Sequence, residues 1–210
     1  MHVLSLDEGE ELVSAARRVI EGYLDNRERF DPERIAFNLH KPAFGKRLGV
    51  FVTLSHFPTG ELRGCVGYKR PTNRLGYELV YAALSAAFGD PRFVPISHKE
   101  LEHLTIEIRL ISEPVPLPKK PTMRERAVRI GRDGLVAEYG IYSGLLLPQV
   151  AVENSMDADE FLEEVCRKAN LPGEYWKQPN IRIYKFETQI FKEEAPNGKV
   201  TEIDISKEGS

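Results

Sequence analysis

The chain has 210 residues, of which 41% are hydrophobic and 29% charged, and its formal net charge is −3. This length and hydrophobic content suit a single domain, or a domain with a smaller lobe, that fills its own core. The acidic balance argues against a dedicated nucleic-acid-binding protein, because such proteins usually carry a basic excess. The charged fraction is typical of cytoplasmic proteins, including heat-stable proteins with many surface ion pairs.

The N-terminus lacks a signal-peptide pattern, because acidic residues interrupt any apolar segment there: Asp7, Glu8, Glu10 and Glu11. No apolar run approaches the length that a membrane-spanning helix needs. The two cysteines, Cys65 and Cys166, do not make a disulfide framework, and a bond between them is disfavoured. We therefore expect a soluble, cytoplasmic protein that does not contact a membrane.

The first expected element is a helix. Ser5 and Glu8 match a capping box, and apolar residues at helical spacing continue to a predicted end near Leu24. A loop that contains Pro32 and Pro42 is expected to follow.

A hairpin comes next. Residues 48–56 are rich in Val, Phe and Thr and predict a strand, and residues 57–60 have turn chemistry. The returning strand, residues 61–69, carries two glycines, a cysteine and an arginine where a packing strand would carry Val and Ile. Period-2 geometry places Arg63 and Cys65 on one face of this strand. A cation beside a thiol favours the thiolate, so we expect the functional site here.

Two interpretations of Cys65 are open. It is either a candidate nucleophile or ligand-contacting thiol, with Arg63 as the neighbouring cation and His56 as proton acceptor, or a small buried thiol that fills space. Which face His56 occupies depends on the register of the hairpin.

Arg63 and the two glycines also have two interpretations each. Arg63 either anchors a carboxylate or phosphate, or forms a structural ion pair with Glu107 or Asp90. Gly64 and Gly67 either let a ligand touch the backbone or relieve crowding inside the sheet.

A helix capped by Asn73 and stopped by Gly89 is expected after the motif strand. The turn that follows contains Asp90 and Arg92, which either line the same site as ligand-binding residues or form an ion-paired cap.

Ser97 and Glu100 match a second capping box, for a short helix. Residues 104–112 then alternate apolar and polar side chains and predict a strand with one polar face. Glu107 and Arg109 share that face, as an acid/base or anchoring pair or as a cross-strand ion pair.

Prolines make the next segment an extended connector: Pro114, Pro116, Pro118 and Pro121. The one locally basic segment overlaps it and contains Lys119, Lys120, Arg124, Arg126, Arg129 and Arg132. Interspersed acidic residues favour a solvated helix there over a nucleic-acid contact.

The second half repeats the order hairpin, helix, strand. Residues 134–139 and 141–147 predict a hairpin, Asp157 starts a helix whose apolar side includes Cys166, and residues 181–191 predict a strand. The two halves, about 45–112 and 130–191, suggest duplication within a single domain over residues 1–192. Hairpins dominate, so we expect the α+β class with a largely antiparallel sheet.

Residues 193–210 are expected to form a polar C-terminal tail, or a short edge strand through Val200, Ile203 and Ile205. No metal or other cofactor is expected, because neither the cysteines nor the histidines show ligand spacing; the histidines are His2, His40, His56, His98 and His103.

Several ordered motifs are similar to the signature blocks of the AMMECR (AMME-syndrome candidate protein-like) family. They are LRGCVG at residues 62–67, AFGDPRF at 87–93 and LLLPQV at 145–150, with KANLP at 168–172 as part of a later block. The resemblance covers roughly residues 5–192.

The resemblance implies an α+β fold with a barrel-like antiparallel sheet, flanking helices, an internal duplication, and a cleft between a larger and a smaller lobe. It also implies that the motif strand, with Arg63, Gly64, Cys65 and Gly67, is the functional site. We expect an enzyme or enzyme-associated protein that binds a small anionic metabolite at this strand. The alternative is a non-catalytic binding or regulatory module, or an adaptor for a Memo-like or radical-SAM partner.

Overall fold

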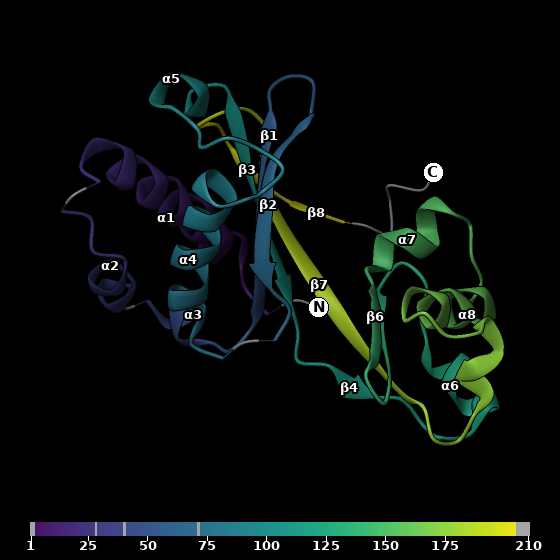
Figure 1. Ribbon diagram of the computed structural model, residues 1–210. Helices are drawn as coiled ribbons and strands as arrows, with labels where there is room; N and C mark the ends of the chain where they lie inside the picture. Colours follow the sequence, from purple (N-terminus) through teal and green to yellow (C-terminus); the bar gives the residue numbers. More distant parts are fainter. Residues whose placement is uncertain (1–2, 28, 40, 71, 205–210) are drawn as a thin grey trace. The chain divides into compact units, whose positions relative to one another are not determined.

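The computed structural model describes residues 3–27, 29–39, 41–70 and 72–204 of the chain. Its contacts divide the chain into two compact units (Figure 1). The N-terminal unit comprises the residues up to Ile111 together with Gln189–Ile203. The middle unit comprises Ser112–Thr188.

In its described residues, the N-terminal unit contains five helices and five strands, of which β7 belongs to it only in part. They are α1 (Leu6–Asp25), α2 (Pro32–Asn38), α3 (Pro42–Gly45), β1 (Gly49–His56), β2 (Leu62–Tyr68), α4 (Leu75–Phe88), α5 (His98–Leu101), β3 (Leu104–Ile111), the last part of β7 (Arg182–Glu193) and β8 (Val200–Ile203).

Strand β1 is central in this unit, because it pairs antiparallel with β2 on one side and with β3 on the other. Its residues alternate as period-2 geometry requires. Val50, Val52 and Leu54 are fully buried, on the face that contacts α4, while Phe51 and Thr53 between them are half-buried. One face of β1, β2 and β3 is therefore buried in the core, and the other face carries partly exposed polar side chains.

Helix α1 confirms the first capping box: Ser5 accepts a hydrogen bond from the backbone of Glu8, whose carboxylate accepts one in return. The loop expected around Pro32 and Pro42 is wrong, because two short helices begin at these prolines. Proline has the backbone angle of a first helical residue and needs no donor there, so it starts a helix as readily as it interrupts one.

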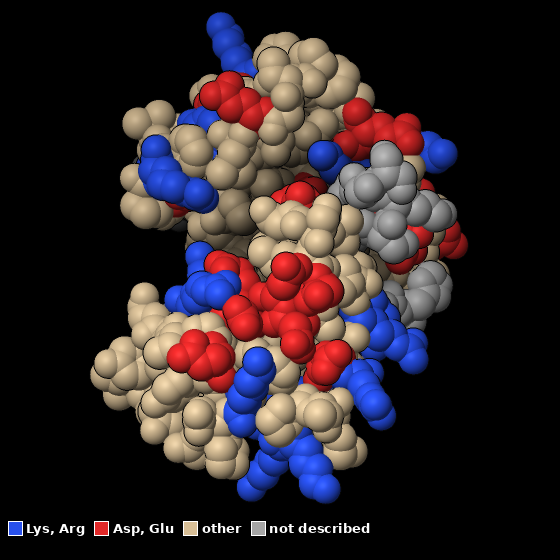
Figure 2. Space-filling model, turned by 90° about the vertical axis from the view of Figure 1, so that its right-hand side faces the viewer, with Lys and Arg blue, Asp and Glu red and all other residues tan. Residues whose placement is uncertain are grey.

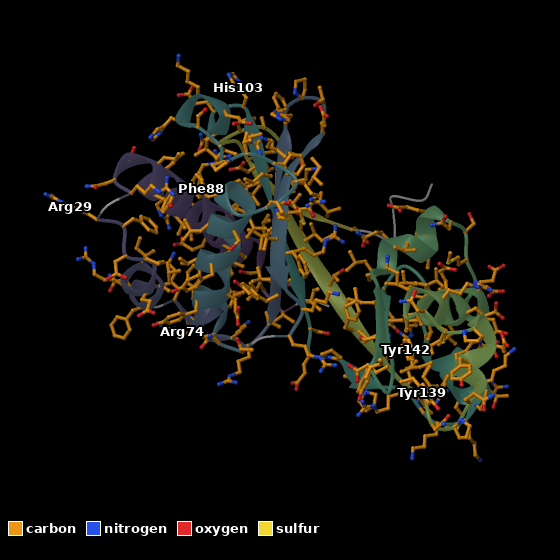
Figure 3. All side chains as sticks on the ribbon, viewed as in Figure 1. Arg29, Arg74, Phe88, His103, Tyr139 and Tyr142 are labelled. Carbon is orange, nitrogen blue, oxygen red and sulfur yellow. The ribbon has the colours of Figure 1, made fainter. Side chains whose placement is uncertain are left out.

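Helix α4 begins one residue later than expected, so Asn73 is not its cap. Arg74, which is labelled in Figure 3, holds the capping position without a side-chain hydrogen bond. Its guanidinium lies 5.0 Å from the centroid of the Tyr77 ring. The buried carboxylate of Glu78 accepts hydrogen bonds from the backbone N–H groups of Thr72 and Asn73, at 2.9 Å each. An acidic residue within the helix thus orders the approach to it, and Gly89 ends the helix as predicted.

The middle unit contains four helical segments and four strands, the last of which continues into the N-terminal unit. They are β4 (Val115–Pro116), α6 (Pro121–Ala127), β5 (Asp133–Tyr139), β6 (Tyr142–Leu146), α7 (Pro148–Glu153), α8 (Ala158–Lys168), the 3-10 helix η1 (Gly173–Lys177) and residues 182–188 of β7. Its core includes Phe161 and Cys166 of α8, as the apolar pattern of that helix predicted, and Trp176 of η1.

The basic segment is only partly a solvated helix, because Arg124 is 1% exposed. Its guanidinium donates hydrogen bonds to the backbone carbonyl oxygens of Pro118, Trp176, Gln178 and Ile181. Burial lowers the pKa of this guanidinium, and no carboxylate of the described residues bonds to it. Arg124 therefore ties the connector before α6 to the segment around η1.

The strands follow the hydrogen-bonded order β2-β1-β3-β7-β5-β6, and β4 and β8 also pair with β7. The strand pairs described are antiparallel, which together with the helices confirms the α+β class. Each unit contains a hairpin, helices and a strand in the predicted order, while the duplication and the cleft stay predictions.

Beyond residue 193 the chain forms β8, so the edge-strand alternative describes residues 200–203 better than a loose tail. Ile205 lies outside the described residues. No helix in the described part of the chain is long and apolar enough to cross a membrane.

Figure 2 shows one face of the molecule, on which basic side chains are interrupted by acidic ones. Interspersed charges of both signs are typical of a solvated surface rather than of a nucleic-acid interface.

Candidate functional site

Strand β2 contains a β-bulge at Arg63. The cross-strand pairs change from Leu54–Gly64 to Ser55–Leu62, so Arg63 is an extra residue. A bulge turns the extra side chain toward the same face as the residue after it. Arg63 and Gly64 therefore point to the α4 side, and the expectation that Arg63 and Cys65 share one face is wrong.

The guanidinium of Arg63 is enclosed and only 6% of the residue is exposed. Its Nε donates to Oε1 of Glu100 at 2.5 Å, and its Nη2 donates to the carbonyl oxygen of Val94 at 2.7 Å. The guanidinium also lies 5.4 Å from the centroid of the Phe93 ring. The Nη1 atom is buried without a hydrogen-bond partner among the described residues.

The structural ion pair of Arg63 thus exists, with Glu100 in place of the expected Glu107 or Asp90. The second capping box is correspondingly half formed. Ser97 accepts a hydrogen bond from the backbone of Glu100, whose carboxylate turns to Arg63 instead of returning to the cap. A buried guanidinium without a carboxylate would be costly, so the ion pair takes precedence over the cap.

Cys65 lies on the opposite, half-exposed face and is itself half-buried. The hydroxyl of Thr53, its cross-strand partner, donates to the Cys65 sulfur at 3.3 Å. Glu107 of β3 continues the same row, because it pairs with Thr53 from the other side. His56 pairs with the buried Leu104 and so faces the other way, which removes it as the expected proton acceptor.

The backbone of Cys65 is held by the turn that follows α4. Strand β2 is at the end of the strand order, and the N–H of Cys65 donates to Oδ2 of Asp90 at 2.9 Å. Arg92 donates from Nη2 to the carbonyl oxygen of Cys65 at 3.4 Å. Arg92 also donates to both oxygens of Asp90, from Nε at 2.9 Å and from Nη2 at 2.6 Å.

We call Asp90 and Arg92 the edge clamp. It occupies the positions that a further strand would take at Cys65, which protects the edge from unwanted pairing. The turn is thus the ion-paired cap, and its cation lies next to Cys65. The side chain of Arg92 is 53% exposed and its Nη1 takes no part in the clamp.

The contacts within the edge clamp shift the pKa values of both of its residues. Hydrogen bonding from Arg92 holds the pKa of the buried Asp90 carboxyl well below its usual range, with further help from the backbone N–H of Cys65. The hydrogen bonds to Asp90, and then the charge of that carboxylate, raise the pKa of Arg92.

Acid should therefore weaken the fold through Asp90. A carboxyl whose pKa is lower in the folded state adds stability above its unfolded pKa of about 3.9, and this stability is lost as the pH falls below that value. We expect Asp90→Asn to lower the free energy of unfolding clearly at pH 7 and much less at about pH 2.5. Urea unfolding of both proteins at the two pH values measures this, and an equal difference at both would contradict the role of the clamp.

Both motif glycines have a packing reason. A Cβ added to Gly64 would lie 2.1 Å from the carbonyl oxygen of Ala86 in α4. A Cβ added to Gly67 would lie 2.2 Å from the carbonyl oxygen of Val50 in β1. The close approach is thus to the protein's own backbone, which favours the crowding interpretation.

Glu107 and Arg109 form an ion pair along β3, with Nη2 of Arg109 donating to Oε1 of Glu107 at 3.1 Å. The pair connects residues two apart on one strand, rather than two strands. Both side chains are partly exposed, on the face that carries Cys65.

The structure therefore brings together Cys65, Asp90 and Arg92 through direct contacts, with Glu107 in the same cross-strand row. The glycines serve packing, and Arg63 lies on the other face.

Sequence reasoning missed Phe93, whose ring lies 5.4 Å from the guanidiniums of both Arg63 and Arg92. It also missed Thr53 and Glu100. Phe93 directly follows Arg92 in the motif and could have been suspected, whereas the other two contacts depend on register and tertiary packing.

No group of three or more His, Cys, Asp and Glu residues in the described ranges could hold a metal ion. His2 and His40 lie outside those ranges.

The two thiols should differ sharply in reactivity. Cys65 is half-buried, whereas Cys166 is fully buried and burial raises its pKa to about 11. We expect a disulfide reagent at pH 8 to modify one thiol per native chain, and two after unfolding in urea. The native reaction should vanish in Cys65→Ser, and two reactive thiols in the native wild type would contradict the burial of Cys166.

The chain is similar to several archaeal proteins. It is 42% identical to Protein PH0010 of Pyrococcus horikoshii over 195 residues, or 91% of this chain and 93% of that protein. It is 41% identical to Protein MJ0810 of Methanocaldococcus jannaschii over 203 residues, or 96% and 98% of the two chains.

The fold is also similar to a solved structure. The crystal structure of the uncharacterized protein PH0010 from P. horikoshii superposes with a TM-score of 0.78 at 40% identity, covering 94% of this chain and 97% of that one. The family model AMMECR1 matches residues 13–191, which include β2, the edge clamp and all of Ser112–Thr188 in the middle unit. The chain therefore belongs to the AMMECR1 family.

Proposed function

We propose that the protein binds a small anionic metabolite on the half-exposed face of β1, β2 and β3, beside Cys65. The observation that carries this proposal is the partly exposed thiol of Cys65 next to the exposed, clamp-held guanidinium of Arg92. A guanidinium with free N–H groups is well suited to a carboxylate or a phosphate. Cys65 is then the group that contacts the ligand or, in an enzyme, attacks it.

In this proposal the other candidate residues orient Arg92 or border the binding face. Asp90 orients Arg92, and Glu107 with Arg109 borders the same face. Arg63 is enclosed with Glu100, so we assign it to holding Phe93 and, through that ring, Arg92. The anion anchor is therefore Arg92 rather than Arg63.

A second candidate function is a non-catalytic binding or regulatory module. It is favoured by the two glycines, whose close contacts are with the protein's own backbone, and by the position of His56 on the opposite face. The same surface would then hold its ligand without covalent chemistry, or take part in an adaptor for a Memo-like or radical-SAM protein. Full ligand binding by Cys65→Ser would favour this candidate.

A thermal-shift screen with anionic metabolites tests the proposal. A ligand at a hundredfold excess over its Kd stabilises the fold by about 2.7 kcal/mol, which for a chain of this size raises the Tm by roughly 5–10 °C. We expect at least one carboxylate or phosphate compound to stabilise the wild type and Arg34→Gln, but not Arg92→Gln. Arg34 is the matched control because it is exposed and lies on α2.

A ligand that stabilises Arg92→Gln as strongly as the wild type would contradict the assignment of the anchor. The Cys65→Ser variant then separates the two candidate functions. Binding that persists in this variant while turnover of the ligand is lost would identify Cys65 as the reacting group.

A further inference from the structure

Strand β6 of the middle unit has an open edge. It lies at one end of the strand order, where it pairs with β5 alone among the described strands. A two-residue turn joins the two strands, and Tyr139 and Tyr142 close this turn as a hydrogen-bonded pair. Hydrogen-bonded pairs recur at every second residue, so the N–H and C=O groups of Ser143 and Leu145 point away from β5. Within the described part of the chain these outward groups have no hydrogen-bond partner.

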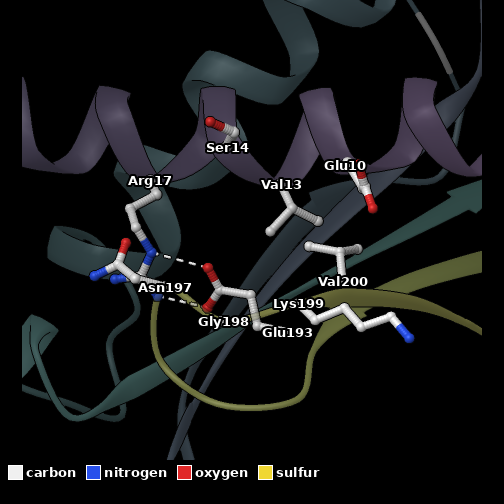
Figure 4. Close-up of a pocket in the computed structure, with 9 residues that line it drawn as sticks. All are labelled: Glu10, Val13, Ser14, Arg17, Glu193, Asn197, Gly198, Lys199 and Val200. Atoms are coloured by element: carbon white, nitrogen blue, oxygen red, sulfur yellow. Dashed lines mark hydrogen bonds and ion pairs between the residues drawn. The ribbon is translucent and has the colours of Figure 1, made fainter.

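The other strands at the edges of the sheet are protected. The edge clamp occupies the outward backbone positions of β2 at Cys65. Strand β4 has two residues and β8 has four, and short strands offer little edge to a partner. Helix α1 also packs against β8, and Figure 4 shows Val13 of the helix and Val200 of the strand, both buried, facing each other.

Strand β6 lacks each of these protections. Residues 139–147 contain no charge and no proline, and the pairing of β6 with β5 runs without a bulge. Two apolar side chains stand in water at this edge, because Ile141 in the turn is 93% exposed and Tyr142 is 45% exposed. A free strand edge of apolar residues is a template for another strand. The partner that fits this edge is therefore an extended, uncharged strand.

We propose that this partner is β6 of a second copy of the chain, paired antiparallel about a two-fold axis at Ser143. The two copies of Ser143 then exchange two backbone hydrogen bonds. Leu145 of each copy lies beside Ile141 of the other, which removes both side chains from water. Tyr142 lies opposite Gly144, which has no side chain to compete for the space. The segment carries no charge, so its two copies bring no like charges together.

Sedimentation equilibrium of the full chain tests this inference. An interface of one strand from each copy falls below about 1,200 Å² of buried surface, so we expect a reversible dimer with a Kd of about 10 µM. Ile141→Lys should weaken the dimer about tenfold, because it replaces the apolar contact with a charge. Met123→Lys is the matched control, since Met123 is also apolar and exposed but lies on α6.

A disulfide cross-link tests the register. The two Cα atoms of a hydrogen-bonded pair are about 5.5 Å apart, which is within the range of a disulfide. We therefore expect Ser143→Cys to give a covalent dimer under mild oxidation, in a Cys65→Ser background that leaves the buried Cys166 as the other thiol. Met123→Cys in the same background should stay largely monomeric on a non-reducing gel.

Three results would overturn the inference. They are a wild-type chain that sediments as a monomer up to about 500 µM, an Ile141→Lys variant that dimerises as strongly as Met123→Lys, and a Ser143→Cys variant that cross-links no faster than Met123→Cys. Strand β6 shares no residue with the surface around Cys65, so these results are independent of the function proposed for that surface.

Discussion

Gly64→Ala is expected to lower the free energy of unfolding by about 3 kcal/mol, the upper part of the range for overpacked sites. The new methyl group would lie 2.1 Å from the carbonyl oxygen of Ala86, which is helix backbone and cannot rotate away. Helix α4 or strand β2 would have to move, and both contribute to the core of the N-terminal unit. The midpoint of urea unfolding, with an unchanged m-value, measures the effect.

Gly45→Ala is the matched control for this prediction. A Cβ at Gly45 meets no atom within 4 Å, so its effect should stay within about 0.5 kcal/mol. The comparison also separates the two interpretations of the motif glycine. If Gly64→Ala folds as stably as the wild type and only ligand binding suffers, then Gly64 serves the ligand rather than the contact with α4.

Arg124→Met should destabilise the protein by roughly 3–5 kcal/mol, because it leaves four carbonyl oxygens without this donor, two of them in buried hydrogen bonds. Arg124 bonds to the carbonyl groups of Pro118, Trp176, Gln178 and Ile181, which belong to segments far apart in the sequence. Methionine fills much of the volume of the side chain but supplies no N–H group. The free energy of urea unfolding is again the measurement.

Arg126→Met gives the control, since Arg126 lies on the same helix and is exposed. Its substitution should change the free energy of unfolding by less than about 0.5 kcal/mol. Equal effects of the two substitutions would show that the bonds of Arg124 to the backbone contribute little to stability.

Local sequence signals predicted most of the secondary structure. The capping box at Ser5, the helix start at Asp157, the hairpins and the alternating strand predicted at 104–112 all appear in the structure. The same kind of signal is ambiguous at prolines, and so the helices that begin at Pro32 and Pro42 were missed. Proline fits both a loop and the first turn of a helix, and only tertiary packing decides between them.

The candidate site was found by its composition but not by its geometry. Strict alternation along the motif strand placed Arg63 beside Cys65, whereas the bulge turns Arg63 to the other face. A bulge adds one residue to one strand, so the side chains before it lie on the opposite faces from those that strict alternation predicts. The sequence of a single strand does not show where such a residue is added. The clamp of Asp90 on the Cys65 backbone likewise depends on how the end of α4 meets β2.

The burial of Arg124 and the ion-pair partner of Glu100 could not be predicted from the sequence either. Arg124 belongs to a segment of basic residues that are mostly exposed, and nothing in its local pattern distinguishes it from Arg126. Glu100 matches a cap but pairs with Arg63, which is 37 residues away in the chain. Such partners are set by the tertiary fold, whereas helical and strand periodicity report only local burial.

The rates at which Cys65 reacts with iodoacetate and with iodoacetamide test the central claim most directly. The two reagents carry out the same alkylation, but only iodoacetate is an anion. If the surface beside Cys65 attracts anions through Arg92, the ratio of the iodoacetate rate to the iodoacetamide rate should exceed that of an unfolded LRGCVG peptide by about three- to tenfold. It should fall toward the peptide value in Arg92→Gln and stay high in Arg34→Gln. A wild-type ratio equal to that of the peptide, or one that Arg92→Gln leaves unchanged, would contradict an anion site at Cys65.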